Sequence, residues 1–408
     1  MGTIECGRKL NTVHRAVGDC TADLVDERIQ TIAPFPGRRF QLSGSAGLTL
    51  AVMLTMILTR HTGLSYWVMA GLVGTAIATF LALVMATKIV AGEERLIYYH
   101  HEIAVMIMAA LFLSAIHKPL LPYLDITILG IGTFLTCGRI GCLMVGCCHG
   151  RPHRWGIRYS EEHAAAGFPS YLVGVRLFPI QAVESFLVLG TVVVGTYFVW
   201  SGQQPGTSLA WYVVTYDAGR FAFEFARGDA DRPYWVGFSQ AQWLALLLTG
   251  GVVWAELAAR LTLSRWHLAI FAFLVASMLA TSLRRRLQRM PDFQLLHPRH
   301  IRQVAGAMKS VCTSNDSSDV HPRGEATVVR IACTSLGIQI SGDEIHCATE
   351  RIFHYTLSCR DEPMTERAAK VVASLIRRLN GVAGSEKLVT GTQGVFHFLI
   401  CAPAVAGL

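Results

Sequence analysis

Long apolar blocks constrain the fold of this chain more than any other feature of its sequence. A helix needs about 20 mostly apolar residues to cross a hydrocarbon core of about 30 Å, and eight segments reach or approach that length. Their apolar residues run in blocks rather than at the period of an amphipathic element, which is typical of membrane spans. The segments are residues 42–59, 64–90, 99–116, 120–148, 178–200, 208–226, 241–261 and 266–283. We therefore predict an all-α polytopic membrane protein with seven or eight transmembrane helices, the last segment being the one that could lie in the interface instead.

The rest of the chain is organised around these blocks. Hydrophobic residues make up 52% of the 408 positions and charged residues only 16%, far from soluble-domain usage. Lys and Arg counts place several loops on the cytoplasmic side, but arginines kept for phosphate binding would bias that count, so the sidedness stays open. The sequence predicts an extramembrane N-terminal segment (1–40), a transmembrane domain (41–283), a basic and polar linker (284–324) and a small α+β extramembrane domain (325–408).

The predicted C-terminal domain mixes strands and a helix. Residues 326–340, 353–358 and 395–400 have strand patterns, and residues 365–379 form a helical pattern that ends near Arg377 and Arg378. Its basic residues could meet anionic lipid, but a solvated helix face is the interpretation that we favour. No aromatic and basic motif of an RNA-binding module is present, so we expect no nucleic-acid partner.

Ionisable side chains inside the apolar blocks are expensive to place in a membrane, so each is a candidate for function. Tyr216, Arg220, Glu224 and Arg227 follow one another at offsets of four, four and three, which places them on one face of a helix. That face could bind a polar ligand, or it could be a structural ladder with Glu224 between two arginines. Both interpretations put a polar strip inside the membrane domain.

A second cluster surrounds Arg139 in segment 120–148. A guanidinium binds phosphate oxygens bidentately and keeps its charge in a low-dielectric site, so Arg139 is a candidate phosphate ligand. The alternative is helix packing with Arg139 extended toward the interface. Asp125 lies about 21 Å away along a continuous helix at 1.5 Å per residue and must have another partner. Glycines that let a backbone or a ligand approach closely stand at positions 138, 141, 146 and 150.

Two pairs of polar residues complete the set of candidates. His100 and His101 begin segment 99–116, and a histidine is the ordinary proton acceptor near neutral pH, so one of them is a candidate general base. Interfacial histidines without chemistry are the alternative. Gln181 and Glu184 lie three residues apart near the start of segment 178–200 and share a helical face.

These motifs together resemble those of the prolipoprotein diacylglyceryl transferase family. The run Gly138-Arg139-Ile140-Gly141, leading to Gly146 and Gly150, is similar to the family signature, with Asp125 at the usual distance before it. Pro179, Gln181 and Glu184 resemble its Pro-x-Gln-x-x-Glu motif, and the face from Tyr216 to Arg227 resembles its late arginine motif. The resemblance covers roughly residues 40–261 and implies the family's seven-span fold.

The resemblance also implies a reaction, in which a diacylglyceryl group passes from phosphatidylglycerol to the thiol of a lipobox cysteine at a bacterial inner membrane. Arg139 and Arg220 would hold the phosphate, and His100 or His101 would act as base. The partners would be phosphatidylglycerol, the prolipoprotein lipobox peptide and the membrane, and the scheme needs no cofactor and no metal. The implied substrate-binding residues are Arg139, Gln181, Glu184, Tyr216, Arg220, Glu224 and Arg227.

Four single positions and one motif depart from the family's pattern. Ser43 stands where the family has a tyrosine, Cys142 where it has an asparagine, Cys147 where it has a glutamate, and Phe178 where it has a histidine. The family's His-Gly-Gly motif of the third span reads His101-Glu102-Ile103 or His100-His101-Glu102 here. The alternative to an active transferase is therefore a catalytically altered paralogue that binds lipid or signals through its C-terminal domain.

The cysteines raise a separate hypothesis. Eleven cysteines, an odd number with loose spacing, favour mostly reduced thiols over a disulfide framework. Cys142, Cys147, Cys148, His149 and His153 carry the atoms that zinc and copper prefer, but their spacing matches no metal signature. Packed thiols at a helix end are the interpretation that we favour, and no metal site is predicted.

Overall fold

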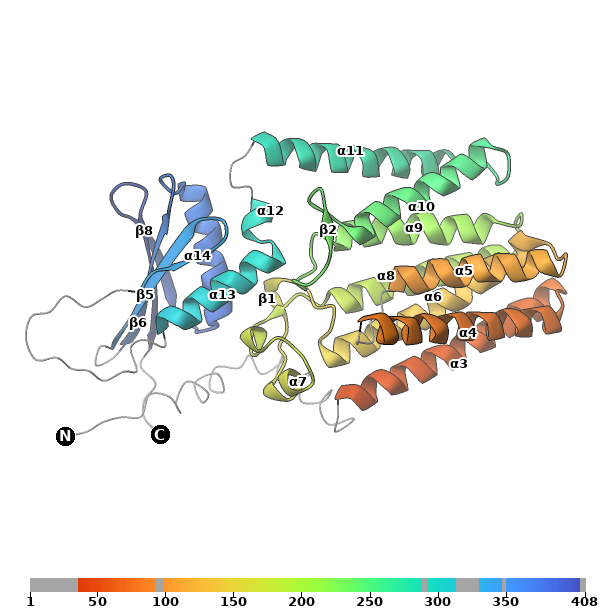
Figure 1. Ribbon diagram of the computed structural model, residues 1–408, viewed down its shortest axis with the longest axis horizontal. Helices are drawn as coiled ribbons and strands as arrows, with labels where there is room; N and C mark the ends of the chain where they lie inside the picture. The colour runs from red at the N-terminus through yellow and green to blue at the C-terminus, as the bar shows by residue number, and fades with distance from the viewer. Residues whose placement is uncertain (1–35, 92–97, 288–291, 313–329, 347–349, 404–408) are drawn as a thin grey trace, which may run out of the picture.

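The computed structural model describes residues 36–91, 98–287, 292–312, 330–346 and 350–403. Most of the predicted N-terminal segment, and residues 288–291 and 313–324 of the predicted linker, lie outside these residues. Within them, a bundle of long helices is followed by a smaller region of strands and helices at one end of the bundle (Figure 1).

Eight long helices of the described bundle coincide with the eight apolar segments. By length and composition, five of them are long and apolar enough to cross a membrane, namely α3, α4, α6, α8 and α11. The segment at 266–283, which had an interfacial alternative, is thus one of the five. The helices are α3 (Pro36–Thr62), α4 (Tyr66–Ala91), α5 (Tyr98–Ala115), α6 (Leu120–Val145), α8 (Ile180–Trp200), α9 (Thr207–Phe223), α10 (Gln240–Leu257) and α11 (Arg265–Leu287).

Helix α6 is the centre of the bundle. It packs against α3, α5, α8 and α9, and 44% of its most apolar stretch is buried inside the protein, against 11% for α4 at the edge. Small residues allow the close approach, because a Cβ on Gly130 would meet Thr55 of α3 and a Cβ on Gly132 would meet Tyr212 of α9. The central position of α6 brings its polar residues next to those of α8 and α9.

Three predicted helices end several residues earlier in the structure than in our prediction, α10 at Leu257 and two others at positions that matter for the candidate site. Helix α6 ends at Val145, where Gly146 adopts φ 85°, so Cys147 and Cys148 lie in a turn instead of on the helix. Helix α9 ends at Phe223, and Glu224 takes the capping position. The prediction that the face from Tyr216 to Arg227 belongs to one continuous helix is therefore wrong at its C-terminal end.

Short elements cover the end of the bundle at which α6 stops. They are β1 (Pro152–Ile157), α7 (Glu161–Ala165), a 3-10 turn η1 (Ser170–Leu172), and the two-residue strands β2 (Tyr234–Trp235) and β3 (Phe238–Ser239). A small apolar cluster that includes Tyr159, Phe168 and Leu172 holds together the loop that carries β1, α7 and η1. We call this set of loops, residues 146–179 and 224–239, the mouth of the bundle.

The C-terminal region contains an antiparallel sheet of order β4-β5-β6-β8-β7. Helices α13 and α14 pack on one face of the sheet, where Val304 and Val372 meet Ile340, Tyr355 and Phe398 in a shared apolar core. Its elements are α12 (Asp292–Leu295), α13 (Pro298–Cys312), β4 (Ala332–Cys333), β5 (Ile338–His346), β6 (Glu350–Cys359), α14 (Glu366–Asn380), β7 (Ser385–Thr390) and β8 (Phe396–Pro403).

The α+β composition of this region is as predicted, but several details differ. The predicted helix 365–379 is α14, and Thr365 caps it by accepting a hydrogen bond from the amide of Ala368 at 3.3 Å. The predicted strand 326–340 is wrong as a single strand, because a turn that ends at Gly337, with φ 77°, separates β4 from β5. Helix α13 and strand β7 were not predicted.

The C-terminal region contacts the mouth directly (Figure 1). Arg378 of α14 donates to the carbonyl of Pro152 at 3.0 Å, and Arg299 of α13 donates to the carbonyl of Arg232 at 3.1 Å. Leu379 packs against the apolar cluster of the mouth. The two parts of the chain are therefore joined through side chains as well as through the linker.

Candidate functional site

Arg139 of α6 and Arg220 of α9 meet at one carboxylate, that of Glu184 on α8. The Arg139 guanidinium lies 3.0 Å from Glu184 Oε1, and Arg220 Nε lies 3.7 Å from the same oxygen. All three side chains are buried, with 7% or less exposed. Arg139 is thus paired inside the protein, and the alternative in which it extends to the interface is wrong.

Two neighbours, Tyr216 and Glu224, extend this group along α9. We call these residues, with Arg139, Glu184 and Arg220, the arginine cluster. The hydroxyl of Tyr216 donates to Glu184 Oε1 at 3.0 Å, and Arg220 pairs with Glu224 at 2.5 Å one helical turn later. A carboxylate beside each arginine offsets part of the cost of burying it. The Arg139 Nε atom is nevertheless a buried donor without a hydrogen-bond partner among the described residues.

Arg227, the last residue of the predicted face, belongs to a different contact. It forms a bidentate pair with Asp229, with both distances 3.0 Å, because the chain leaves the helix before it. The second arginine beside Glu224 is instead Arg232, from the loop before β2, which also lies 2.8 Å from Asp229. The predicted ladder of Glu224 between two arginines therefore exists, but Arg232 replaces Arg227 in it.

The loop carboxylate Asp229 is held ionised by these arginines. Burial alone would raise its pKa, but Arg227 and Arg232 outweigh burial and leave the pKa of Asp229 below its usual range. The mouth therefore presents fixed charges of both signs at the end of the buried cluster.

The two candidate histidines lie in different environments. His100 is exposed, and its Nε2 atom is 2.8 Å from the side-chain nitrogen of Gln240 on α10. His101 is buried, and its ring lies 4.9 Å from that of Phe80 on α4. His101 and the next residue, Glu102, both face the interior of the bundle.

An apolar cavity of about 480 Å³ lies between α3, α4, α5 and α6. Its walls are mostly aliphatic and aromatic. The polar residues of its lining are His101, Glu102, Gln41, Ser45, Thr55 and Thr127. Glu102 is also close enough to Tyr216 and Asp217 to act electrostatically on both. Representative wall residues are Phe40, Leu48, Leu72, Phe80, Ile131 and Phe134.

Two further predicted residues position the backbone. The side-chain amide of Gln181 donates to the carbonyl of Cys147 at 2.8 Å, which ties the turn after α6 to α8. Asp125 accepts hydrogen bonds from the amides of Gly206 at 2.6 Å and Leu209 at 2.7 Å. The expected separate partner of Asp125 is thus the N-terminus of α9.

Sequence reasoning missed a second buried carboxylate on α9. Asp217 accepts a hydrogen bond from the Tyr99 hydroxyl at 2.8 Å and lies 3.4 Å from the Thr249 hydroxyl of α10. An acidic residue inside an apolar block is itself a signal, because its burial is costly. Asp217 escaped notice because it lies off the helical face that carries Tyr216 and Arg220.

The four departures from the family's pattern also have defined places. Ser43 donates a hydrogen bond to the Cys137 carbonyl, and the Phe178 ring lies 5.5 Å from that of His153 in the mouth. Cys142 and Cys147 lie at the end of α6, where their side chains approach that of Cys148. The described cysteines are free thiols, in agreement with the expectation of mostly reduced cysteines.

Comparisons with known proteins agree with these motifs. A family model described as prolipoprotein diacylglyceryl transferase matches residues 31–256, which is more than half of the chain. A Clostridium perfringens protein named phosphatidylglycerol–prolipoprotein diacylglyceryl transferase 2 is 30% identical over 136 residues, covering 32% of this chain and 49% of that protein. A Dehalococcoides mccartyi protein named phosphatidylglycerol–prolipoprotein diacylglyceryl transferase is 30% identical over 125 residues, covering 31% and 46%.

The chain therefore spans about half the length of the curated relatives that it matches. No solved structure matches the chain significantly. The matched residues include α3, α6, α8 and α9 and hence every residue of the arginine cluster. This protein is a membrane protein that belongs to the prolipoprotein diacylglyceryl transferase family.

Proposed function

We propose that this protein transfers a diacylglyceryl group from phosphatidylglycerol to the cysteine thiol of a prolipoprotein lipobox. The observation that carries the proposal is the convergence of Arg139 and Arg220 on Glu184, with distances of 3.0 and 3.7 Å. Two buried guanidinium groups on different helices can bind one phosphate together. Family membership supports a transferase, and the names of the relatives supply the two substrates.

In this proposal, Arg139 and Arg220 hold the phosphate of the lipid. The donor Arg139 Nε, which has no hydrogen-bond partner among the described residues, is available to a phosphate oxygen. Glu184 and Glu224 keep the guanidinium groups in place before the lipid arrives, so little reorganisation is needed when charge develops on the leaving phosphate. Gln181 and Tyr216 support this arrangement through their bonds to Cys147 and Glu184. Arg227 holds Asp229 in the mouth, and Asp229 in turn pairs with Arg232 beside Glu224.

The acyl chains of the lipid would occupy the cavity of about 480 Å³ between α3 and α6. Its mostly apolar walls suit hydrocarbon, and Glu102 of its lining acts electrostatically on Tyr216, which bonds to Glu184. This arrangement would put the glycerol carbon between the cavity and the phosphate site.

His101 is our choice for the base, because it lines the cavity whereas His100 is exposed beside Gln240. His101 would take the proton of the acceptor thiol. The sulfur would then attack the glyceryl carbon, a C–S bond would form, and the C–O bond to the phosphate would break. The electron pair of that bond would leave with glycerol phosphate.

We further propose that seven or eight of the long helices span the inner membrane of a bacterium. Charged residues inside α9 lower its hydropathy, and burial against α6 and α8 removes the need for a fully apolar surface. We keep segment 1–40 and domain 41–283 as part of this proposal. The C-terminal domain, predicted as 325–408, begins at α12 instead, because Leu295, Ile301 and Val304 of the predicted linker 284–324 lie in its apolar core.

The test is a transfer assay with the purified chain, phosphatidylglycerol and a synthetic lipobox peptide. Mass spectrometry measures the increase in peptide mass that transfer produces. We expect Arg139→Gln and Arg220→Gln each to lower the rate by about 10²–10³-fold, the usual loss for a donor to developing charge. The control is Arg60→Gln, since Arg60 is an exposed residue in the last turn of α3, and it should match the unmodified protein. His101→Asn should lose more activity than His100→Asn.

A different result would favour the altered paralogue. If the chain transfers nothing under conditions in which the Clostridium perfringens relative is active, the substitutions at Ser43, Cys142, Cys147 and Phe178 have abolished turnover. Retained binding of phosphatidylglycerol, lost in Arg139→Gln, would then identify a lipid-binding protein.

A further inference from the structure

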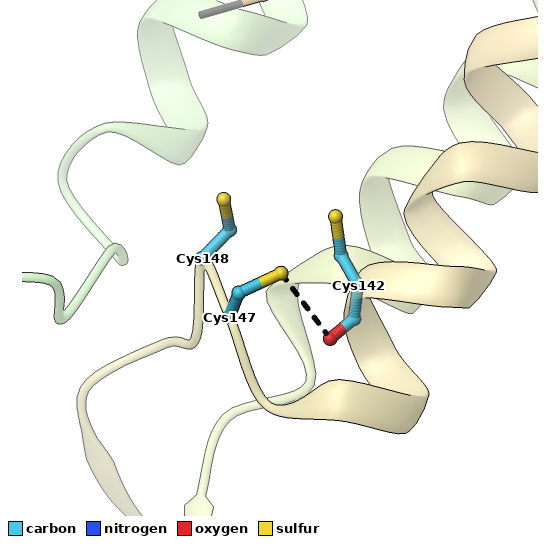
Figure 2. Close-up of side chains that lie close together, drawn as sticks. All are labelled: Cys142, Cys147 and Cys148. Atoms are coloured by element: carbon cyan, nitrogen blue, oxygen red, sulfur yellow. Dashed lines mark hydrogen bonds between the residues drawn. The ribbon is translucent and has the colours of Figure 1, made fainter. Parts of the chain in front are cut away.

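The three cysteines at the end of α6 lie close enough to share one ligand. The sulfur atoms of Cys142, Cys147 and Cys148 all lie within 4.8 Å of one another. Figure 2 shows the Cys142 side chain leaving the last turns of the helix and the other two leaving the turn that follows it. This is the only group of three or more His, Cys, Asp or Glu side chains in metal-binding range among the described residues.

The backbone of the turn holds the thiols in this arrangement. Cys148 has φ 56°, in the left-handed region that residues with a side chain rarely adopt. Gly146, with φ 85°, packs so tightly that a Cβ there would clash with Phe168 and press on Tyr159. The Gln181 side chain fixes the Cys147 carbonyl from α8. The backbone of the turn is therefore fixed by its surroundings, and this backbone places the Cys147 and Cys148 side chains beside Cys142.

The spacing is compatible with a bound metal ion. Thiolates about 2.3 Å from a common ion lie about 4 Å from one another, which needs shifts of less than about 1 Å from the observed arrangement. A disulfide would instead require two sulfurs to approach to about 2.05 Å. Three cysteine sulfurs favour a soft ion over magnesium or calcium.

The surroundings also allow entry and charge balance. Cys147 is exposed, and Cys147 and Cys148 line a cavity of about 180 Å³ in the mouth, which Arg302 of α13 also lines. Arg139 and Arg227 both act electrostatically on Cys148 and would offset the negative charge of a thiolate cluster. An ion held by three sulfurs would keep its remaining position toward this cavity.

We propose that Cys142, Cys147 and Cys148 form a three-thiolate site for a thiophilic d10 metal ion, Cu⁺ or Zn²⁺, with its open side toward the mouth. The site adjoins the residues of the proposed transfer reaction, but metal binding does not depend on that reaction. Binding would join the last turn of α6 to the turn that Gln181 contacts, so it would stiffen the end of the helix that carries Arg139.

The test uses the purified full chain in detergent, reduced and free of metal, under argon. Transfer of Cu⁺ from its bicinchoninate complex measures copper affinity, and Co²⁺, as a substitute for Zn²⁺, reports thiolate bonds through its charge-transfer absorption. We expect one ion per chain and a higher thermal midpoint once it is bound. Cys142→Ser, Cys147→Ser and Cys148→Ser should each weaken binding by more than about 100-fold, beyond the loss of a merely supporting residue.

The matched control is Cys137→Ser, because Cys137 lies on the same helix but outside the cluster, and it should bind like the unmodified chain. The thermal midpoint of each metal-free variant identifies any that fails to fold, and Cys147→Ser, at the exposed position, then carries the test. Binding that is unchanged in the triple serine variant would overturn the proposal. So would a disulfide within the cluster found by mass spectrometry in protein isolated under argon.

Discussion

Replacing Glu184 by glutamine tests whether one carboxylate organises the arginine cluster. Glutamine keeps the shape of the side chain but removes the charge that faces Arg139 at 3.0 Å and Arg220 at 3.7 Å. Glu184 is 1% exposed, so water cannot replace the lost charge. Removing one partner of a buried ion pair costs about 3–5 kcal/mol, and we expect a loss of stability in that range.

The assay has two readouts, thermal unfolding in detergent and transfer to a lipobox peptide. Because the arginines would lose their common anchor, we expect the transfer rate to fall by about 10²–10³-fold. Glu366→Gln is the matched control, since Glu366 pairs with Lys370 at the surface with 66% of each side chain exposed, and neither readout should change.

A double-mutant cycle decides whether Glu184 acts through Arg139. If it does, the variant with both Glu184→Gln and Arg139→Gln should lose less than the sum of the two single losses, with a coupling of about 0.5–3 kcal/mol. Strictly additive losses would refute the reasoning, because they would mean that the two side chains act independently.

Three further changes test other parts of the structure. Asp125→Ala should destabilise the protein by about 0.5–2 kcal/mol, since it removes the cap of α9, as measured by thermal unfolding beside Asp125→Asn, which keeps one acceptor. The pKa of His297 is lowered to about 4 by burial and then by the nearby Arg151 and Arg299, so the unfolded chain takes up this proton near pH 6.5 while the folded chain resists it. The contribution of the neutral His297 ring to the free energy of unfolding should therefore be intact above about pH 6.5 and decline as the pH falls toward 4. The unfolding midpoint should fall less steeply across this range in His297→Asn than in the unmodified protein. Arg302→Ala breaks an exposed ion pair with Asp231 and should lower the free energy of unfolding by no more than about 1 kcal/mol. A larger loss in thermal unfolding would show that this pair stabilises the contact between α13 and the mouth.

The helices of the bundle could be predicted because a membrane demands long apolar segments, and each of the eight segments is a helix in the structure. The ends of the helices could not be predicted as well. Nothing in the sequence between Glu224 and Arg227 breaks the helical period, and α9 stops before them where Glu224 pairs with Arg220 and Arg232. Helix ends that depend on tertiary contacts leave no local signal.

The candidate site divides in the same way. The contact of Arg139, Glu184 and Arg220 could be predicted from their motifs, because each lies on a helix and packed helices bring their facing sides together whatever the loops do. Arg232 was missed because it lies in a loop without periodicity. In the C-terminal region, α13 had a signal, since Ile301, Val304 and Met308 follow helical spacing, whereas the edge strand β7 is mostly exposed and has none.

The most direct test of the central claim is a structure of the protein in nanodiscs of phosphatidylglycerol. We predict that the phosphate of one lipid lies within about 3 Å of the guanidinium nitrogens of both Arg139 and Arg220, with its acyl chains in the cavity lined by Phe80 and His101. A lipid phosphate bound elsewhere, or one that contacts only one of the two arginines, would contradict the account.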